Sequence, residues 1–159
     1  MKKGDEYFPT RARVLNILLA DDDKDDCLFF KEALEELQFQ GKLTIVHDGQ
    51  QLMKLLINKS DEPFHILFLD INMPRKNGLE CLEEIKSNNI LKSLPVIILS
   101  TSYDEKIAYQ LYKKGAQHYI CKPGDFSELK KVILHALILV SGKKTPHPGK
   151  NDFLLTNLN

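Results

Sequence analysis

The sequence lacks any apolar run approaching the roughly 18 residues that a membrane-spanning helix needs. It also lacks an excess of charge, because Lys and Arg together number 22 and Asp and Glu together number 22. Balanced charge argues against nucleic-acid binding and membrane-surface binding, since both need a clustered positive excess. We therefore expect a cytoplasmic protein with no nucleic-acid partner and no membrane partner.

Cysteine is scarce and shows no pairing pattern. The three cysteines, Cys27, Cys81 and Cys121, are an odd number without CxxC spacing, which argues against a disulfide framework or a zinc site. The chain also has no internal repeat, no HExxH motif and no visible Ser-His-Asp set. A length of 159 residues with 43% hydrophobic residues fits one globular domain.

Short apolar runs alternate with amphipathic stretches along most of the chain. The first run, 14–20, is nearly all apolar and short, as a strand buried on both faces would be. The other predicted strands are 43–47, 64–69, 95–99 and 117–121. Five strand–helix alternations predict an α/β fold, a doubly wound five-stranded parallel sheet with helices on both faces. Ser102 is predicted to cap the fourth helix, which ends near Gly115.

Three segments follow from this pattern. Residues 14–140 form the predicted domain, and residues 1–13 form an N-terminal extension. From Ser141 the helical period is lost, so we expect residues 141–159 to be a flexible tail. Such a tail is too short for a DNA-binding output domain, which favours protein–protein contact as the output.

Polar residues stand where the predicted strands end. They are Asp21, Asp22 and Asp23 after the first strand, Asp70 after the third, Ser100 and Thr101 after the fourth, and Lys122 after the fifth. The carboxyl ends of parallel strands share one edge of the sheet, so these side chains should converge. Carboxylates about 5 Å apart repel by roughly 3 kcal/mol per pair at an effective dielectric near 20. A divalent cation with oxygen ligands, such as Mg²⁺, would offset that repulsion.

A carboxylate, a magnesium ion and a lysine around one oxyanion predict a phosphoryl-transfer site. Asp70 can attack phosphorus, because aspartate forms aspartyl phosphates. The metal and Lys122 can offset charge on the phosphoryl oxygens, and Ser100 can donate a hydrogen bond to one of them.

Four motifs carry these residues, namely LLADDD (18–23), FLDINMPRKNG (68–78), ILST (98–101) and YICKP (119–123). With them, residues 14–140 resemble the receiver domain of two-component response regulators, which has the CheY-like, flavodoxin-like fold. Gly124 and Asp125 separate the Lys-Pro pair from Phe126, a variant that resembles stand-alone regulators of bacteriophytochrome type.

The resemblance implies roles for individual residues. Asp70 resembles the phospho-acceptor, and Asp21 and Asp22 resemble the acidic pair that helps it hold Mg²⁺ or Mn²⁺. Asn72 resembles the position whose backbone carbonyl binds the metal.

Further roles are implied by the same motifs. Ser100 and Tyr119 resemble the switch residues, with Thr101 as a competing candidate if the strand slips by one residue. Lys122 resembles the family's site lysine, and the Lys122–Pro123 bond resembles one that is usually cis. Asp23, Asp25 and Asp26, in contrast, are expected to form a solvated helix N-terminus, where the helix dipole favours acidic side chains.

The resemblance also implies the partners. A sensor histidine kinase or a phosphotransfer protein would supply the phosphoryl group, self-hydrolysis would remove it, and an unidentified downstream protein would read it. A homodimer through the fourth helix, the fifth strand and the fifth helix is a further expectation. The surface is more aromatic than a soluble helix requires, which favours contact there through three tyrosines and an isoleucine: Tyr103, Ile107, Tyr109 and Tyr112.

Three alternatives stay open at this point. A haloacid-dehalogenase-like phosphatase also uses a nucleophilic aspartate, but it needs a second acid where this chain has Asn72. A flavodoxin-like cofactor binder needs a phosphate-cradling loop after the first strand, where Asp21 and Asp22 would repel phosphate. A degenerate receiver acting as a phosphorylation-independent scaffold is the third.

Overall fold

The computed structural model describes residues 14–58, 62–141 and 146–155 of the chain. Six strands lie in it: β1 (Leu15–Ala20), β2 (Gly41–Val46), β3 (Ile66–Leu69), β4 (Val96–Ser100), β5 (His118–Cys121) and β6 (Leu154–Leu155). Five α-helices accompany them: α1 (Lys24–Glu36), α2 (Gly49–Asn58), α3 (Gly78–Ser87), α4 (Glu105–Lys113) and α5 (Phe126–Val140), with a short 3₁₀ helix, η2 (Lys150–Asp152).

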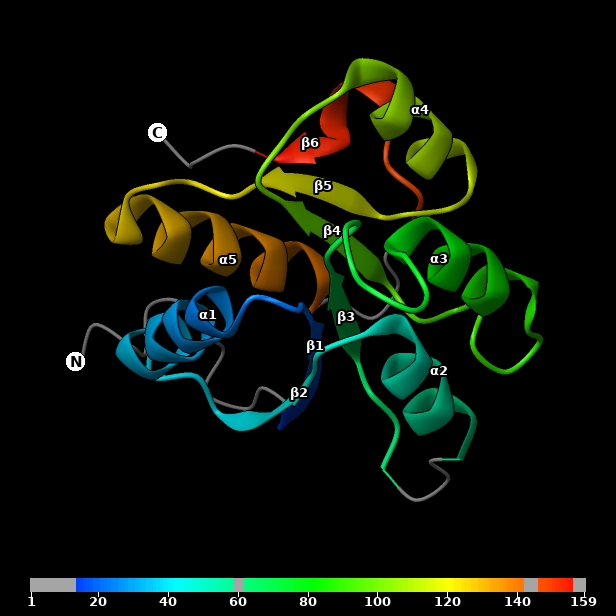
Figure 1. Ribbon diagram of the computed structural model, residues 1–159. Coiled ribbons are helices and arrows are strands. Elements are labelled where there is room, and N and C mark those ends of the chain that lie inside the picture. The colour runs from blue at the N-terminus through cyan, green and yellow to red at the C-terminus, as the bar shows by residue number, and fades with distance from the viewer. Residues whose placement is uncertain (1–13, 59–61, 142–145, 156–159) are drawn as a thin grey trace.

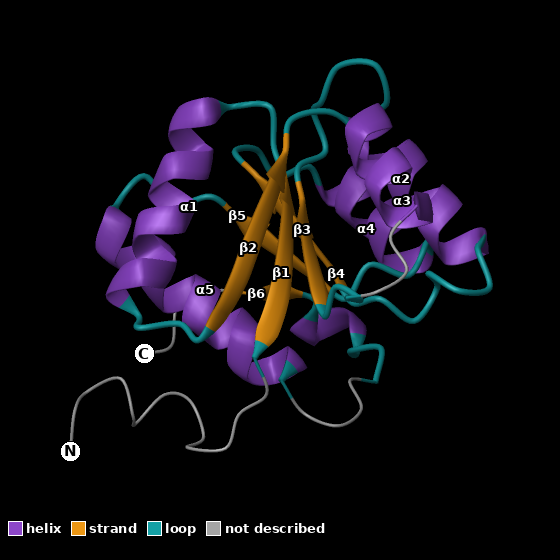
Figure 2. Cartoon of the chain, turned by 90° about the horizontal axis from the view of Figure 1, so that it is seen from below, coloured by secondary structure: helices purple, strands orange, loops and turns teal. Residues whose placement is uncertain are grey.

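The strands form one sheet in the order β2-β1-β3-β4-β5-β6, and every neighbouring pair is parallel. Figures 1 and 2 show α1 and α5 on one face and α2, α3 and α4 on the other. The doubly wound α/β architecture expected from the alternating pattern is therefore confirmed. None of the helices in these described ranges is long and apolar enough to cross a bilayer.

Alternate residues of the central strands point into two separate cores. Ile17 and Leu19 of β1 pack toward α1 and α5, whereas Leu18 and Ala20 pack toward the helices of the other face. Both sets are at most 1% exposed. This two-sided burial explains why β1 reads as a continuous apolar run and not as an alternating one.

Helix starts are set by aspartate and asparagine caps. Asp23 caps α1, as the acidic stretch indicated, and its Oδ1 accepts hydrogen bonds from the amides of Asp25 and Asp26. The α4 cap differs from the prediction: Asp104 caps this helix and Ser102 does not. An aspartate is at least as good a cap as serine, so the acid nearer the helix takes the position.

Residues 146–155, which belong to the segment expected to be a flexible tail, instead add a strand to the sheet. The predicted N-terminal extension 1–13 and residues 142–145 and 156–159 of the tail lie outside the described residues. Over residues 146–155 the chain forms η2 and β6, and β6 pairs with β5 at the sheet edge (Figure 1). Phe153 and Leu155 are buried, while Leu154 between them faces outward. Two buried residues are too short a pattern to predict a strand, and the open edge of β5 supplies the missing partner.

Candidate functional site

The predicted site residues converge at the carboxyl edge of the sheet. Asp21 and Asp22 follow β1, Asp70 follows β3, and each offers a carboxylate oxygen within 4.8 Å of the other two. Asp21 is 1% exposed and Asp70 is 6% exposed, while Asp22 is exposed to solvent. The convergence expected from the parallel sheet is thus observed for the three acids.

Asp21 is held in place from both oxygens. Its Oδ1 accepts a hydrogen bond from the amide of Asp23 at 3.0 Å, and its Oδ2 accepts one from Lys122 Nζ at 2.6 Å. The carboxylate therefore stays fixed at the end of β1, and it joins the start of α1 to the end of β5.

Asp70 lies at the end of β3 in a buried, negative environment. Its Oδ1 accepts a hydrogen bond from the amide of Asn72 at 3.2 Å. Burial, and next the charge of Asp21, raise the pKa of Asp70 from 3.8 to about 7, against the lowering effects of Lys122 and the Asn72 amide. The surroundings of Asp70 therefore disfavour its charged form, first through burial and next through the neighbouring negative charge of Asp21.

The loop after Asp70 needs a glycine to fold back over the strand end. A Cβ at Gly78 would lie 2.4 Å from the backbone oxygen of Asp70, and the Gly78 amide donates to the carbonyl of Ile71 at 2.8 Å. Asn77 then caps α3 through a reciprocal capping box with Glu80. This tight turn keeps Asn72 beside Asp70.

Lys122 reaches the site from the end of β5. Its ammonium bonds Asp21 Oδ2 at 2.6 Å and Asp26 Oδ2 at 2.8 Å, and its side chain is 10% exposed. Burial alone would lower the pKa of Lys122, but the hydrogen bonds to the two carboxylates outweigh that effect and raise it. The lysine is therefore charged, as a partner for oxyanions must be.

The interpretation of Asp26 as part of a solvated helix terminus was wrong. Its side chain is 30% exposed and forms an ion pair with Lys122. A signal for this lay in the sequence, since Asp26 precedes Phe30 and Leu34 at four-residue spacing on the buried face of α1. An acid on that face near the strand ends points toward the site.

Ser100 and Tyr119 lie at the neighbouring strand ends. Ser100 is fully buried, and its Oγ accepts a hydrogen bond from the Ser102 amide at 3.4 Å. Tyr119 is 1% exposed, and its hydroxyl donates to the Ser102 carbonyl. Thr101, the competing candidate, is exposed. Both candidate switch residues therefore contact the same residue of the β4–α4 loop.

The Lys122–Pro123 bond differs from the expectation. The resemblance implied a cis bond, whereas the described residues contain no cis peptide, so this bond is trans. Trans is the lower-energy form of an X–Pro bond by about 0.5–1 kcal/mol.

The donor set fits a hard divalent cation. Its three carboxylates supply only oxygen ligands, which Mg²⁺ and Mn²⁺ prefer, and two of them are buried. A cation there would neutralise charge that Lys122 alone leaves uncompensated. The Asp21, Asp22 and Asp70 cluster thus points to a divalent metal beside a buried carboxylate.

Comparison with known proteins identifies the family of this chain. Residues 17–134 match the family described as the response regulator receiver domain. Response regulator Rcp1 of Synechocystis sp. is 34% identical over 135 residues, which cover 82% of this chain and 88% of the relative.

Two solved structures share the fold. The phosphorylated cyanobacterial phytochrome response regulator RcpA superposes with a TM-score of 0.74 at 30% identity, covering 80% of this chain and 94% of that chain. The Mn²⁺-bound form of Rcp1 superposes with a TM-score of 0.71 at 29% identity, covering 85% and 99%. Receiver domains are phosphorylated on an aspartate. The family match, the shared fold and the acidic edge of the sheet show that this chain belongs to the response-regulator receiver family.

Proposed function

We propose that the chain is a cytoplasmic response regulator that takes a phosphoryl group on Asp70 from a histidine of a sensor kinase or a phosphotransfer protein. The observation that carries this proposal is the acidic cluster around Asp70, with three carboxylate oxygens within 4.8 Å of one another. The positions of Asp21, Lys122 and Ser100 around it support the same reaction.

The transfer forms one bond and breaks one bond. An oxygen of the Asp70 carboxylate bonds to phosphorus, while the bond from phosphorus to the partner's histidine nitrogen breaks and leaves its electron pair on that nitrogen. Asp21, Asp22, Asp70 and the backbone carbonyl of Asn72 are the groups that would hold Mg²⁺ or Mn²⁺. When bound, the cation supplies positive charge that stabilises the phosphoryl oxygens.

Two protein groups would assist at the phosphoryl oxygens. The Lys122 ammonium offers a charged donor, and the Ser100 hydroxyl offers a neutral one. Charge-assisted hydrogen bonds contribute roughly 1.5–3 kcal/mol each. Moving a two-state receiver from 1:99 to 99:1 needs about 5.5 kcal/mol of differential interaction, which these bonds and the cation can supply together.

The switch would run through the β4–α4 loop. Ser100 now accepts from the Ser102 amide, and Tyr119 now donates to the Ser102 carbonyl. When Ser100 turns to the phosphoryl group it releases that amide, and the loop and the Tyr119 ring then rearrange together. Self-hydrolysis of the aspartyl phosphate returns the loop to its resting position.

Strand β6 changes the surface that a downstream partner would contact, because it pairs with β5 at the edge of the sheet. Tyr112, expected on the exposed surface, donates to the Pro148 carbonyl at 2.9 Å and packs on Phe153. Tyr103, Ile107 and Tyr109 are each more than 40% exposed. A downstream protein or a second copy would therefore meet α4, β6 and α5, because β6 covers the edge of β5.

A mass measurement tests the phosphoryl acceptor. Incubation with acetyl phosphate or phosphoramidate and Mg²⁺ should add one phosphoryl group to the intact chain, and EDTA should prevent the gain. Asp70→Asn should abolish it, while Asp25→Asn, the same change on the exposed first turn of α1, should retain it. A chain that never gains the group in Mg²⁺ or Mn²⁺ would favour the scaffold alternative.

The other two alternatives are not supported. A receiver domain is normally a signalling element and not a metabolic enzyme, which removes the reason to expect a haloacid-dehalogenase-like phosphatase. The loop after β1 carries Asp21 and Asp22 beside Asp70, so it presents negative charge where a flavodoxin-like protein would bind a phosphate.

A further inference from the structure

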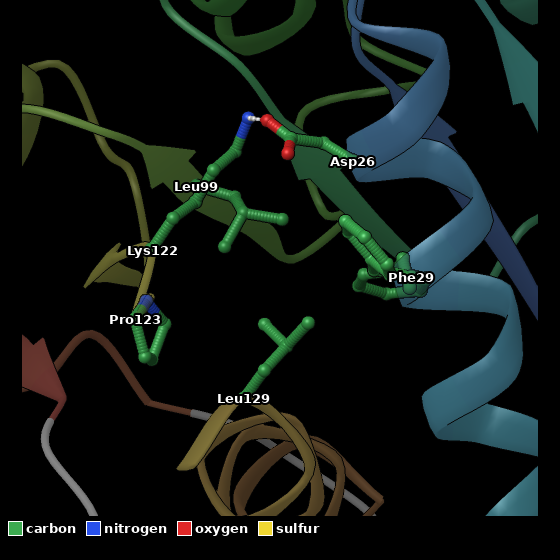
Figure 3. A pocket seen from close by; sticks show the side chains of 7 residues that line it. Asp26, Phe29, Leu99, Lys122, Pro123 and Leu129 are labelled. Carbon is green, nitrogen blue, oxygen red and sulfur yellow. Dashed lines mark hydrogen bonds and ion pairs between the residues drawn. The ribbon is translucent and has the colours of Figure 1, made fainter. Parts of the chain in front are cut away.

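The Lys122 ammonium is tied to helix α1 as well as to the site. Figure 3 shows its ion pair with Asp26, which spans from the end of β5 to the first turn of α1. The two atoms, Lys122 Nζ and Asp26 Oδ2, lie 2.8 Å apart. This contact joins residues 96 positions apart in the chain, so it depends on the fold and not on local sequence.

The surroundings of this pair strengthen it. The pair lies at a pocket whose apolar lining includes Phe29, Leu99 and Leu129 (Figure 3). Apolar walls lower the local dielectric, so a charge–charge contact there is stronger than one in open water. The amide of Asp26 also bonds the Asp23 cap at 3.0 Å, which fixes the backbone that carries the carboxylate.

Lys122 is not paired with the proposed phospho-acceptor. Among the described residues its ion pairs within 4.0 Å are with Asp21 and Asp26, and none joins it to Asp70. Two of the three ammonium donors are therefore occupied by carboxylates other than Asp70. A phosphoryl oxygen at Asp70 has to compete with these carboxylates for the charge of Lys122.

We propose that Asp26 is a positioning residue that holds the Lys122 ammonium toward α1 in the resting receiver and thereby weakens the binding of a phosphoryl group at Asp70. The inference rests on the proposed function of Asp70. The Asp21–Lys122 ion pair cannot be removed without also changing the acidic cluster, because Asp21 is a member of that cluster. Asp26 lies outside that cluster, so its ion pair with Lys122 can be removed while all three carboxylates of the cluster remain.

Beryllofluoride, a tetrahedral stand-in for the phosphoryl group, tests the inference. Its affinity is measured by titration at saturating Mg²⁺ with NMR of the backbone amides as the readout. We expect Asp26→Asn to bind it roughly fivefold more tightly, the change expected when a partly exposed ion pair is released. Asp25→Asn removes the same charge from the same helical turn without contacting Lys122, and we expect its affinity to match that of the unaltered chain.

A second titration separates positioning from general charge. Removing a negative charge near a cation site weakens Mg²⁺ binding or leaves it unchanged, so Mg²⁺ alone should bind Asp26→Asn no more tightly than the unaltered chain. Urea unfolding without metal checks that the variant is folded, and Asp26→Ser provides a second substitution if Asp26→Asn is not.

Two results would overturn the inference. Beryllofluoride affinity that is unchanged or weaker in both Asp26 variants would mean that Asp26 does not restrain Lys122. Affinity that rises equally in Asp25→Asn would assign the effect to charge alone. Failure of the proposed function is a different result, in which the unaltered chain neither binds beryllofluoride nor gains a phosphoryl group.

Discussion

The backbone carbonyl of Phe153 accepts a hydrogen bond from the amide of Tyr119 at 2.9 Å, and the rings of the two residues pack with centroids 6.3 Å apart. The C-terminal segment is thus anchored on the residue proposed as the aromatic switch. His118 Nδ1 adds a contact with the Asp152 carbonyl at 3.1 Å. The added strand β6 is therefore part of the core and not an appendage.

Shortening Phe153 should destabilise the fold. Its ring is 5% exposed and lies against Tyr112 and Tyr119, so Phe153→Ala removes buried apolar area and leaves a cavity. We expect the free energy of unfolding in urea to fall by about 3 kcal/mol. Leu154→Ala, at the exposed neighbouring position, should change it by less than about 1 kcal/mol. Equal effects of the two substitutions would contradict the packing of β6 on β5.

The parts of this protein that sequence predicts are those set by local pattern and topology. Apolar runs mark β1 and β3, and a parallel sheet forces Asp21 and Asp70 onto one edge, since every strand ends there. The sequence alone therefore predicts that the site acids lie close together.

The parts that sequence missed depend on contacts distant in the chain. The Asp26–Lys122 ion pair joins residues 96 apart, and acidic residues in a first turn are ordinarily solvated. The strand β6 has two residues and exists because β5 offers an open edge. Helical spacing places Asp26 on the buried face of α1, but it does not identify Lys122 as the partner. Two residues are too few for a periodicity that would predict β6.

Burial of the Asp70 carboxyl makes stability depend on pH. Its pKa rises to about 7 in the folded chain from 3.8, so the folded state binds this proton more tightly than the unfolded state. Stability from this group is therefore present below about pH 4 and is lost as the pH rises through 7. In EDTA at pH 8, Asp70→Asn should be more stable than the unaltered chain by roughly 2 kcal/mol.

The comparison at lower pH provides the check. At pH 4.5 the unaltered Asp70 is protonated in the fold, so the advantage of Asp70→Asn in urea unfolding should largely disappear. An Asp70→Asn chain that is less stable than the unaltered chain at pH 8 would mean that burial does not raise the pKa of Asp70.

Mg²⁺ should offset the loss of folding stability that repulsion among the clustered carboxylates causes. A cation that binds the folded chain alone at about 100 times its Kd raises the free energy of unfolding by about 2.7 kcal/mol. Thermal unfolding should show a higher Tm in Mg²⁺ than in NaCl of equal ionic strength. Asp21→Asn and Asp70→Asn should lose most of this rise, because each removes a buried carboxylate of the cluster. An equal rise in these variants would place the cation elsewhere.

The start of α2 supports the loop that follows Asp70. A Cβ at Gly49 would lie 2.0 Å from the backbone oxygen of Lys76, so the two backbones touch. Arg75 Nη1 also bonds the buried Asp48 Oδ2 at 3.2 Å, and Asp48 Oδ1 accepts from the Gln51 amide. The loop that carries Asn72 is therefore braced against α2.

Gly49→Ala should push this loop away from α2. Because backbone cannot yield as a flexible side chain does, we expect the free energy of unfolding to fall by about 3 kcal/mol. The displaced loop should also weaken Mg²⁺ binding, measured by calorimetric titration, since Asn72 bonds Asp70 from that loop. Gly124→Ala is the matched control, because a Cβ there meets nothing within 4 Å. If Gly49→Ala lowers stability but leaves Mg²⁺ affinity unchanged, α2 braces the fold without positioning the site.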